Sequence, residues 1–245
     1  MFPNACDCHV HIYGVGHPVA PTVTAPPPNA PLSDYLTVRN AMGTDRVVLV
    51  QPTAYSTNDS CLVKAMIELG DRARGVAVVD TGVSDTELDR PTRTGTRGIR
   101  FQMLPGGTVP CEILEEMAAC VVAFGWHVQL QMDARRLPER VEVLSRLPGR
   151  LVIDHTRKLL EPVLIDDPSF RCLLRLLESG KVWVKLSAPC ETSKFCPPHY
   201  DDVSRLPRAL VQAAPERMAW TSNWPHLGIT PGRAQIAAVD GRLGA

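Results

Sequence analysis

Two histidines near the start of the chain, His9 and His11, have the type and spacing of a catalytic or metal-binding pair. They belong to an apolar segment, 6–12, whose pattern predicts a buried β-strand. Because side chains alternate between the two faces of a strand, Asp7, His9 and His11 are predicted to share one face. Cys8 is then predicted to lie on the other face. Two imidazoles on one face can bind a metal ion or exchange a proton with a substrate oxygen, although two histidines in an ordinary strand are the simpler alternative.

Strand and helix patterns alternate along the chain. The expected strands lie at 6–12, 46–51, 75–80, 98–103, 127–132, 151–155, 182–187 and 217–224. The expected helices lie at 34–42, 59–69, 84–89, 111–124, 135–147, 168–178 and 201–214. This alternation indicates an α/β fold with a parallel sheet, and eight such units close into a (β/α)8 TIM barrel. An open doubly wound sheet is less favoured, because no Gly-x-Gly-x-x-Gly follows the first strand.

The segments between these elements refine the prediction. Residues 13–31 are rich in Pro and Gly and form a loop long enough to be functional. Ser33 is expected to cap the first helix, and Ser84 to begin a weak helix that ends before Pro91. The pattern after the last strand is only weakly helical, so we expect a short or missing eighth helix and some uncovered barrel surface. We therefore expect one barrel domain over 1–245, with oligomerisation through the uncovered seam as an open alternative.

Composition argues against several classes of protein. Lys and Arg total 26, as do Asp and Glu, so the balanced charge gives no reason to expect nucleic acid or an anionic membrane as a partner. No apolar run reaches the roughly 18 residues of a spanning helix, and the N-terminus lacks a secretion signal. The 8 cysteines are scattered without a Cys-x-x-Cys pair, which favours free thiols in a reducing compartment. We expect a cytoplasmic protein.

Further polar residues lie at or just beyond the predicted C-terminal ends of the strands, where TIM barrels form their active sites. They are Gln51, Tyr55, Arg100, Gln102, Gln129, Gln131, Asp154, His155, Arg157, Lys185, Ser187, Ser193, Asn223 and His226. Burying such a set without a polar ligand would cost several kcal/mol, so we expect a cavity that holds a polar small molecule.

Several short motifs, taken together, resemble the amidohydrolase superfamily. They are Asp-x-His-x-His at 7–11, Arg-Gly-Ile-Arg-Phe at 97–101, Ile-Asp-His at 153–155, Lys-Leu-Ser at 185–187 and Ser-Asn-Trp-Pro-His at 222–226. More narrowly, the set is similar to the metal-independent lactonase branch of pyrone-dicarboxylate hydrolases, sulfomuconolactone hydrolases and galactarolactone isomerases. The resemblance implies a small anionic lactone as the substrate.

The resemblance also bears on metal binding. Metal-dependent members of the superfamily bind their ion with the strand-1 histidines, a Glu or carboxylated Lys on strand 4, histidines on strands 5 and 6, and an Asp on strand 8. At three of those positions this chain has amide side chains: Gln102, Gln131 and Asn223. Only His9, His11 and His155 remain, and three imidazoles without a carboxylate are a poorer site for a divalent ion such as zinc. We expect no metal and no other cofactor; a bound metal would have these three histidines as ligands.

Asn223 favours the isomerases within this branch. The hydrolases have an Asp at this position that activates water, whereas an amide can orient a hydroxyl or carbonyl group but cannot act as a general base. The galactarolactone isomerases resemble this chain in having Asn in Ser-Asn-Trp-Pro-His. In their reaction a hydroxyl of the substrate attacks the ester carbonyl, so no water needs activating. We expect this chain to isomerise a sugar-acid dicarboxylate lactone by intramolecular acyl transfer.

In this hypothesis His11 or His9 is the general base on the attacking hydroxyl. His155 polarises the lactone carbonyl or stabilises the oxyanion, Asn223 orients the reacting group, and Arg100 binds the substrate carboxylate. Other expected substrate contacts are Gln51, Tyr55, Arg157, Lys185, Ser187 and Ser193. For Lys185 an ion pair inside the barrel is the alternative, and for Arg157 a solvated loop.

Two other functions stay open. A lactone hydrolase would need a base other than Asn223, such as His155. A non-catalytic barrel would account for the weak pattern after His226 and for the weak helix near 89–95.

Overall fold

The computed structural model describes residues 3–21, 23, 27–103, 109–154, 165–187, 193, 200 and 202–226. His155 and Arg157 lie outside these residues, as does the segment after His226 in which a short or missing eighth helix is expected.

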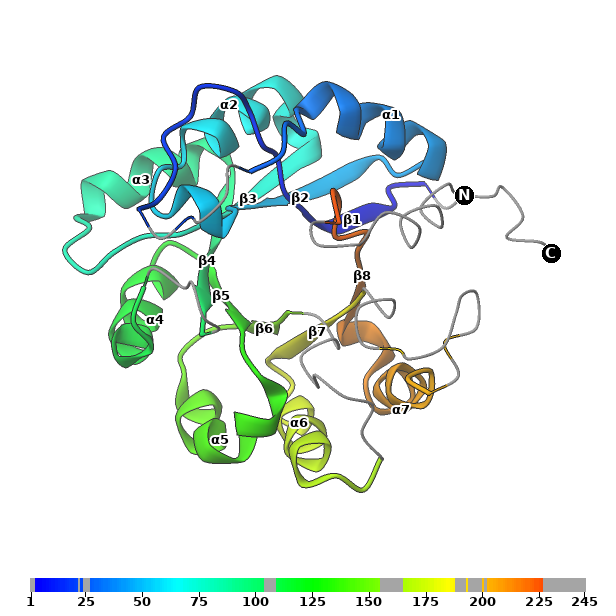
Figure 1. The fold of residues 1–245 in the computed structure, drawn as a ribbon. Coiled ribbons are helices and arrows are strands. Elements are labelled where there is room, and N and C mark those ends of the chain that lie inside the picture. Colours follow the sequence, from blue (N-terminus) through cyan, green and yellow to red (C-terminus); the bar gives the residue numbers. More distant parts are fainter. Residues whose placement is uncertain are drawn as a thin grey trace.

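Eight parallel strands form one sheet that curves into a ring, in the order β1 to β8 (Figure 1). The strands are β1 (Cys6–Val10), β2 (Arg46–Val50), β3 (Ala73–Ala77), β4 (Thr96–Gln102), β5 (His127–Gln131), β6 (Leu151–Ile153), β7 (Val182–Leu186) and β8 (Met218–Trp220). The helices that surround them are α1 (Leu32–Met42), α2 (Ser60–Leu69), α3 (Asp85–Thr94), α4 (Leu114–Val122), α5 (Leu137–Arg146), α6 (Pro168–Glu178) and α7 (Arg205–Ala213). The predicted TIM barrel is confirmed.

Apolar side chains between the strands and the helices form the core. One cluster, which includes Tyr35 and Leu49, lies beneath α1 and α2. A second, which includes Leu130 and Leu144, lies beneath the later helices. Trp220 on β8 is 52% exposed. Among the described residues, none of the helices has the length and apolar character needed to cross a membrane.

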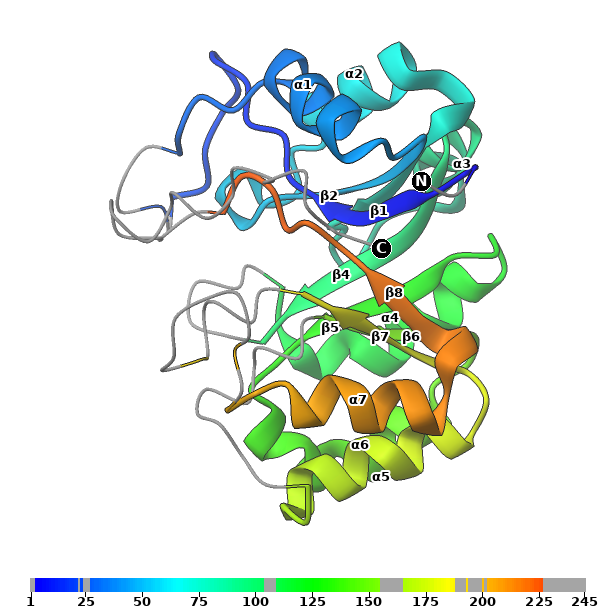
Figure 2. The same ribbon diagram turned by 90° about the vertical axis from the view of Figure 1, so that its right-hand side faces the viewer.

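The barrel closes just beyond the end of β8. Within the described part of the chain, β1 and β8 meet at an isolated parallel bridge between Val10 and Trp224. The Asn223 N–H donates to the His9 carbonyl (3.1 Å), and the His11 N–H donates to the Trp224 carbonyl (2.9 Å). Figure 2 shows the chain running on from β8 alongside β1. The closure therefore brings Asn223 next to the histidine pair.

β1 does not alternate regularly, because it contains a β-bulge. Asp7 and Val10 are three residues apart, yet they pair with two residues of β2 that are only two apart. Both consequently lie on the side of β1 that faces α1, where the Tyr35 hydroxyl donates to Asp7 (3.3 Å) and Val10 joins the core. His9 and His11 share the other side. The prediction that Asp7 shares a face with these histidines is therefore wrong.

Two predicted helix boundaries are also corrected. Pro31 is the N-cap of α1, so Ser33 lies in the first helical turn and does not cap it. Ser84 does cap α3, with a reciprocal pair of bonds to Glu87 that forms a capping box. α3 continues through Pro91 to Thr94. A proline removes only one helical N–H, and here Pro91 is buried, which offsets that loss.

These two serines give a matched test of helix capping. Replacing an N-cap serine by alanine costs about 1 kcal/mol, so Ser84→Ala should lower the free energy of unfolding by that amount. Ser33→Ala should change it by less than about 0.5 kcal/mol, as for an ordinary surface position. Urea denaturation followed by circular dichroism measures both. Equal losses in the two variants would contradict this assignment of the caps.

Candidate active site

A buried carboxylate, Asp154, lies inside the barrel directly after β6. Its Oδ2 accepts a hydrogen bond from Gln129 Nε2 (2.8 Å). Its Oδ1 lies 3.3 Å from Lys185 Nζ, and its Oδ2 lies 3.7 Å from Arg100 Nε. These partners come from β4, β5 and β7, and side chains of strands that are not neighbours can meet only in the barrel interior. The interior is therefore a charge cluster and not an apolar core.

Lys185 connects this cluster to the histidine pair. Its Nζ donates to Gln129 Oε1 (2.6 Å) and lies 3.2 Å from His9 Nδ1. Burial lowers the pKa of Lys185, and the nearby Asp154 carboxylate acts in the opposite direction. The structure thus shows the barrel-interior ion pair that was the alternative to a substrate contact for Lys185.

His9 and His11 are in direct contact, with their Nε2 atoms 3.1 Å apart. His11 Nδ1 lies 2.8 Å from the Val50 carbonyl oxygen, which can only accept, so His11 carries a proton on Nδ1. In neutral His11 the lone pair is then on Nε2, and His9 Nε2 must donate to it. The lone pair of a neutral His9 therefore faces the Lys185 ammonium. For neutral imidazoles the hydrogen bonds then run from Lys185 through His9 to His11, and His9 Nδ1 also lies 3.4 Å from Asp154 Oδ1.

Arg100 is fixed below the rim of the barrel and is 6% exposed. Its Nη1 donates to the Gln51 carbonyl oxygen (2.9 Å) and its Nη2 donates to Gln131 Oε1 (2.6 Å). Each of these nitrogens carries a second N–H, so the held guanidinium keeps the capacity to bind a carboxylate.

Several predicted substrate contacts have partners within the protein. Gln51 Nε2 donates to the carbonyl oxygens of Ser56 and Asn58, which fixes the turn after β2. The Tyr55 hydroxyl accepts from the Gly14 N–H and donates to the Gly14 carbonyl, so it fixes the start of the long loop. Both residues position loops at the mouth of the barrel, and their contact with substrate stays a prediction.

Of the remaining predicted residues, three lie among the described residues and two do not. Ser187 and Asn223 are buried at the C-terminal ends of β7 and β8. The Ser193 hydroxyl donates to Asp202 (2.5 Å). His155 and Arg157 lie outside the described residues, so the structure does not place them.

Asp154 and Gln129 bring the interior groups together, although neither has a role in the chemistry predicted from the sequence. A signal was present, because both residues were predicted to lie at strand ends. Asp154 and Lys185 also lie on adjacent strands, where an opposite charge is the expected partner of a buried lysine.

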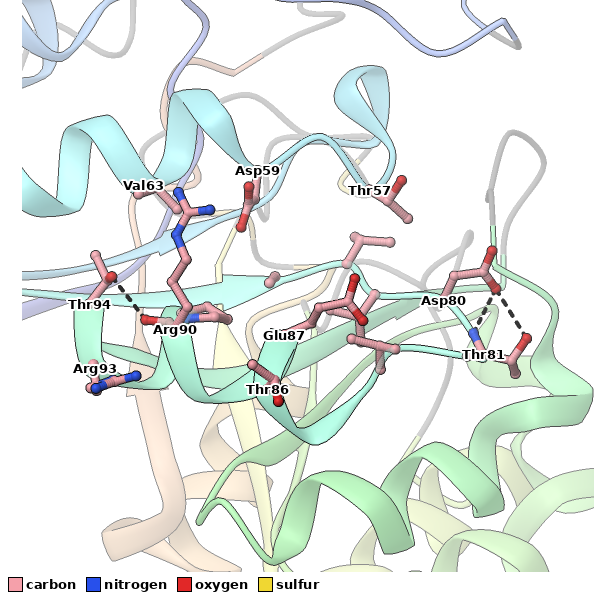
Figure 3. A pocket seen from close by; sticks show the side chains of 16 residues that line it. Thr57, Asp59, Val63, Asp80, Thr81, Thr86, Glu87, Arg90, Arg93 and Thr94 are labelled. Carbon is pink, nitrogen blue, oxygen red and sulfur yellow. Dashed lines mark hydrogen bonds between the residues drawn. The ribbon is translucent and has the colours of Figure 1, made fainter.

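A hollow of about 850 Å³ lies outside the barrel, between α2 and α3. Figure 3 shows charged side chains in it, including Asp59 and Glu87 and the guanidinium of Arg90. None of the predicted site residues lines it, so we place the candidate active site in the barrel interior and at its mouth.

Metal binding can be assessed from the donors in the described residues. The two Nε2 atoms of His9 and His11 converge, but a protein zinc site takes three or four protein ligands. Within the described residues, no group of three His, Cys, Asp or Glu side chains could hold a metal ion. These residues by themselves do not complete a metal site.

The fold and this interior define a TIM-barrel protein with a polar, charged centre and paired histidines at the strand ends. The chain belongs to the amidohydrolase family, whose sequence profile it matches over residues 6–244.

Three relatives narrow the class. A D-galactarolactone isomerase of Agrobacterium fabrum is 32% identical over 228 residues, 92% of this chain and 78% of that protein. A 2-pyrone-4,6-dicarboxylate hydrolase of Comamonas testosteroni is 32% identical over 235 residues, 91% of this chain and 77% of that protein. A crystal structure of an Agrobacterium tumefaciens protein without ligand superposes with a TM-score of 0.88 at 31% identity, over 96% of this chain and 86% of that one. The family resemblance expected from the motifs is confirmed, and both an isomerase and a hydrolase are among the relatives.

The interior ion pair predicts a large effect on stability. Removing one partner of a buried pair costs about 3–5 kcal/mol, so Lys185→Met should lower the free energy of unfolding by that amount. Arg136→Met is the matched control, because it breaks the exposed pair with Glu139 and should cost less than about 1 kcal/mol. Urea denaturation at pH 7 measures both. Similar small losses would mean that Lys185 is not part of a coupled buried cluster.

Proposed function

We propose that this protein is a lactone isomerase that moves the ester bond of a sugar-acid dicarboxylate lactone by intramolecular acyl transfer. The observation that carries the proposal is the position of Asn223 beside the histidine pair, hydrogen-bonded through its N–H to the His9 carbonyl. The resemblance implies that hydrolases of this branch have a basic Asp there. A relative named as a D-galactarolactone isomerase supports the same choice.

The histidine pair supplies the proton transfer in this proposal. The attacking substrate hydroxyl displaces the His9 N–H from His11 Nε2 and gives its proton to this nitrogen, because the other nitrogen of His11 is held as a donor by Val50. The hydroxyl oxygen then bonds to the lactone carbonyl carbon to give a tetrahedral intermediate. The bond from that carbon to the original ring oxygen breaks, and His11 returns the proton to this oxygen. No water is consumed, and the proton balance closes within the site.

The other groups bind and orient the substrate. Asn223 orients the reacting hydroxyl or carbonyl, and Arg100 binds a carboxylate with its remaining N–H groups. Before substrate binds, the Lys185 ammonium beside His9 Nδ1 holds His9 as a donor toward His11. His155 keeps its proposed role at the carbonyl or oxyanion. We propose that no metal takes part, since this chain has amides at three positions where metal-dependent members have ligands.

A cytoplasmic location is part of the proposal. The cysteines among the described residues, which include the buried Cys61 and Cys172, are free thiols, as expected in a reducing compartment.

A lactone hydrolase is the second candidate, favoured by the equally similar relative named as a pyrone-dicarboxylate hydrolase. It would need an imidazole, such as that of His11 or His155, to activate water in place of Asn223.

Proton NMR of galactaro-1,5-lactone with the purified protein tests the reaction directly. We expect the five-membered lactone to accumulate faster than in buffer, at the same rate with and without excess EDTA. His11→Asn, which removes the proposed base, should lower the rate by about 10²-fold or more. The open diacid as the main product would favour the hydrolase, and loss of the rate in EDTA would refute the metal-free mechanism. A rate equal to buffer would refute this substrate.

Asn223→Asp tests the role of the amide. A general base contributes about 10²–10⁴-fold, so even a poorly placed carboxylate should raise the ratio of hydrolysis to isomerisation at least tenfold. Asn223→Ala is the control, and it should slow isomerisation without adding hydrolysis. An unchanged product ratio in Asn223→Asp would show that water activation already uses another group.

A further inference from the structure

Asp7 is a fully buried charge that the proposed reaction does not use. Its Oδ1 accepts from the Ser222 N–H (2.9 Å) and, at 3.5 Å, from the His9 N–H. Its Oδ2 accepts from the Ser222 hydroxyl (2.5 Å) and from the Tyr35 hydroxyl (3.3 Å). Burial raises the pKa of Asp7, and the two bonds from Ser222 oppose that shift. A carboxylate with this many donors is held as a fixed acceptor on the outer side of β1.

Ser222 passes this anchor on to the segment that carries Asn223. Its hydroxyl donates to Asp7 and accepts from the Trp224 N–H (3.1 Å). One Ser222 oxygen therefore connects Asp7 to the residue that follows Asn223. Two further backbone bonds hold the same turn: Asn223 N–H to the His9 carbonyl, and His226 N–H to the Asn223 carbonyl. The turn is therefore hydrogen-bonded to β1 in two ways, through the Asp7 side chain and through the His9 carbonyl.

Asn223 needs such a restraint because its backbone is left-handed, with φ 58°. Asn tolerates this region better than most residues, but a non-glycine residue stays there only when its surroundings hold it. The side chain of such a residue leaves the backbone in a different direction from that of an extended residue. The conformation of the turn therefore decides where the Asn223 amide points.

We infer that Asp7 is a positioning residue that acts through Ser222 to set the orientation of the Asn223 side chain. For its catalytic consequence this inference rests on the proposed function. The structural part of the inference, a link from the Asp7 carboxylate to the Asn223 amide, does not depend on the proposed function. The alternative is that Asp7 only stabilises the barrel seam.

Ser222→Ala and Tyr35→Phe form a matched pair, because each removes one hydroxyl from the same Asp7 oxygen. Only the first also releases the Trp224 N–H. A displacement of about 1 Å at a reacting group costs about 10²-fold in rate, so we expect Ser222→Ala to lower kcat by at least tenfold, with KM changed by less than about twofold. Tyr35→Phe should keep kcat within about twofold of the wild type. Ser222→Thr, which retains the hydroxyl, should restore kcat.

A spectroscopic readout keeps the test independent of turnover. The side-chain amide pair of Asn223 is identified in a ¹⁵N–¹H spectrum as the signal lost in Asn223→Asp. That signal should move or broaden in Ser222→Ala and in Asp7→Asn, and stay in place in Tyr35→Phe and Ser222→Thr. Asp7→Asn serves if Ser222→Ala fails to fold, because the two Ser222 donors bond to different Asp7 oxygens and asparagine replaces one of these oxygens by an NH2 donor.

The outcomes separate the two hypotheses. Wild-type protein that turns over no lactone would refute the proposed function, and the amide signal would still decide this inference. An Asn223 signal that does not move in Ser222→Ala would overturn the inference. So would an unchanged kcat, or equal losses in Ser222→Ala and Tyr35→Phe, since equal losses indicate a purely stabilising role.

Discussion

The buried carboxylate of Asp154 is the constraint on which the barrel interior depends. Two cations, Lys185 and Arg100, lie inside the ring, and without an anion between them their burial would cost several kcal/mol each. Asp154 compensates both, while Gln129 bonds to the carboxylate and to the ammonium at once. Because these groups come from four consecutive strands, β4 to β7, one carboxylate fixes that half of the barrel. Asp154 Oδ1 lies 3.4 Å from His9 Nδ1, and Lys185 Nζ lies 3.2 Å from the same nitrogen, so the groups that stabilise the interior also contact the histidine pair.

A second carboxylate, Asp7, acts from the opposite side of the same strand. The bulge in β1 makes this division of roles possible, because it turns Asp7 toward α1 while His9 stays inside. Asp154 thus contacts the histidine pair inside the barrel. Asp7, on the outer side of β1, is hydrogen-bonded to the turn that carries Asn223. β1 is the element that both carboxylates contact, and the proposed reacting groups lie at the seam between β1 and β8. An active site at the seam depends on closure of the barrel, which links catalysis to folding more directly than a site on one loop would.

The alternation of strands and helices could be predicted because apolar periodicity is a local property, and the bounds of α6 agree with the predicted 168–178. Predictions from local patterns were wrong where other features of the fold overrode the local preference. The bulge in β1 leaves no mark in the apolar pattern, and burial of Pro91 keeps α3 helical. The strand ends that bear the site could likewise be predicted, because barrel topology places them together. The partner of Asp7 could not, because Ser222 is 215 residues away and lies on the same edge only after the barrel closes.

The choice between isomerisation and hydrolysis comes down to which group near the end of β8 can accept a proton. Among the described residues, Asp154 has its oxygens in contact with Gln129, Lys185, Arg100 and His9, and Asp7 faces away from the interior. Both carboxylates are therefore committed to holding other groups in place. Asn223 offers no basic atom, and proton transfer falls to the imidazoles. An imidazole that accepts and returns a proton suits a reaction in which the same proton leaves one substrate oxygen and returns to another. Intramolecular acyl transfer is such a reaction, whereas hydrolysis would require that acceptor to hold and activate a water molecule as well.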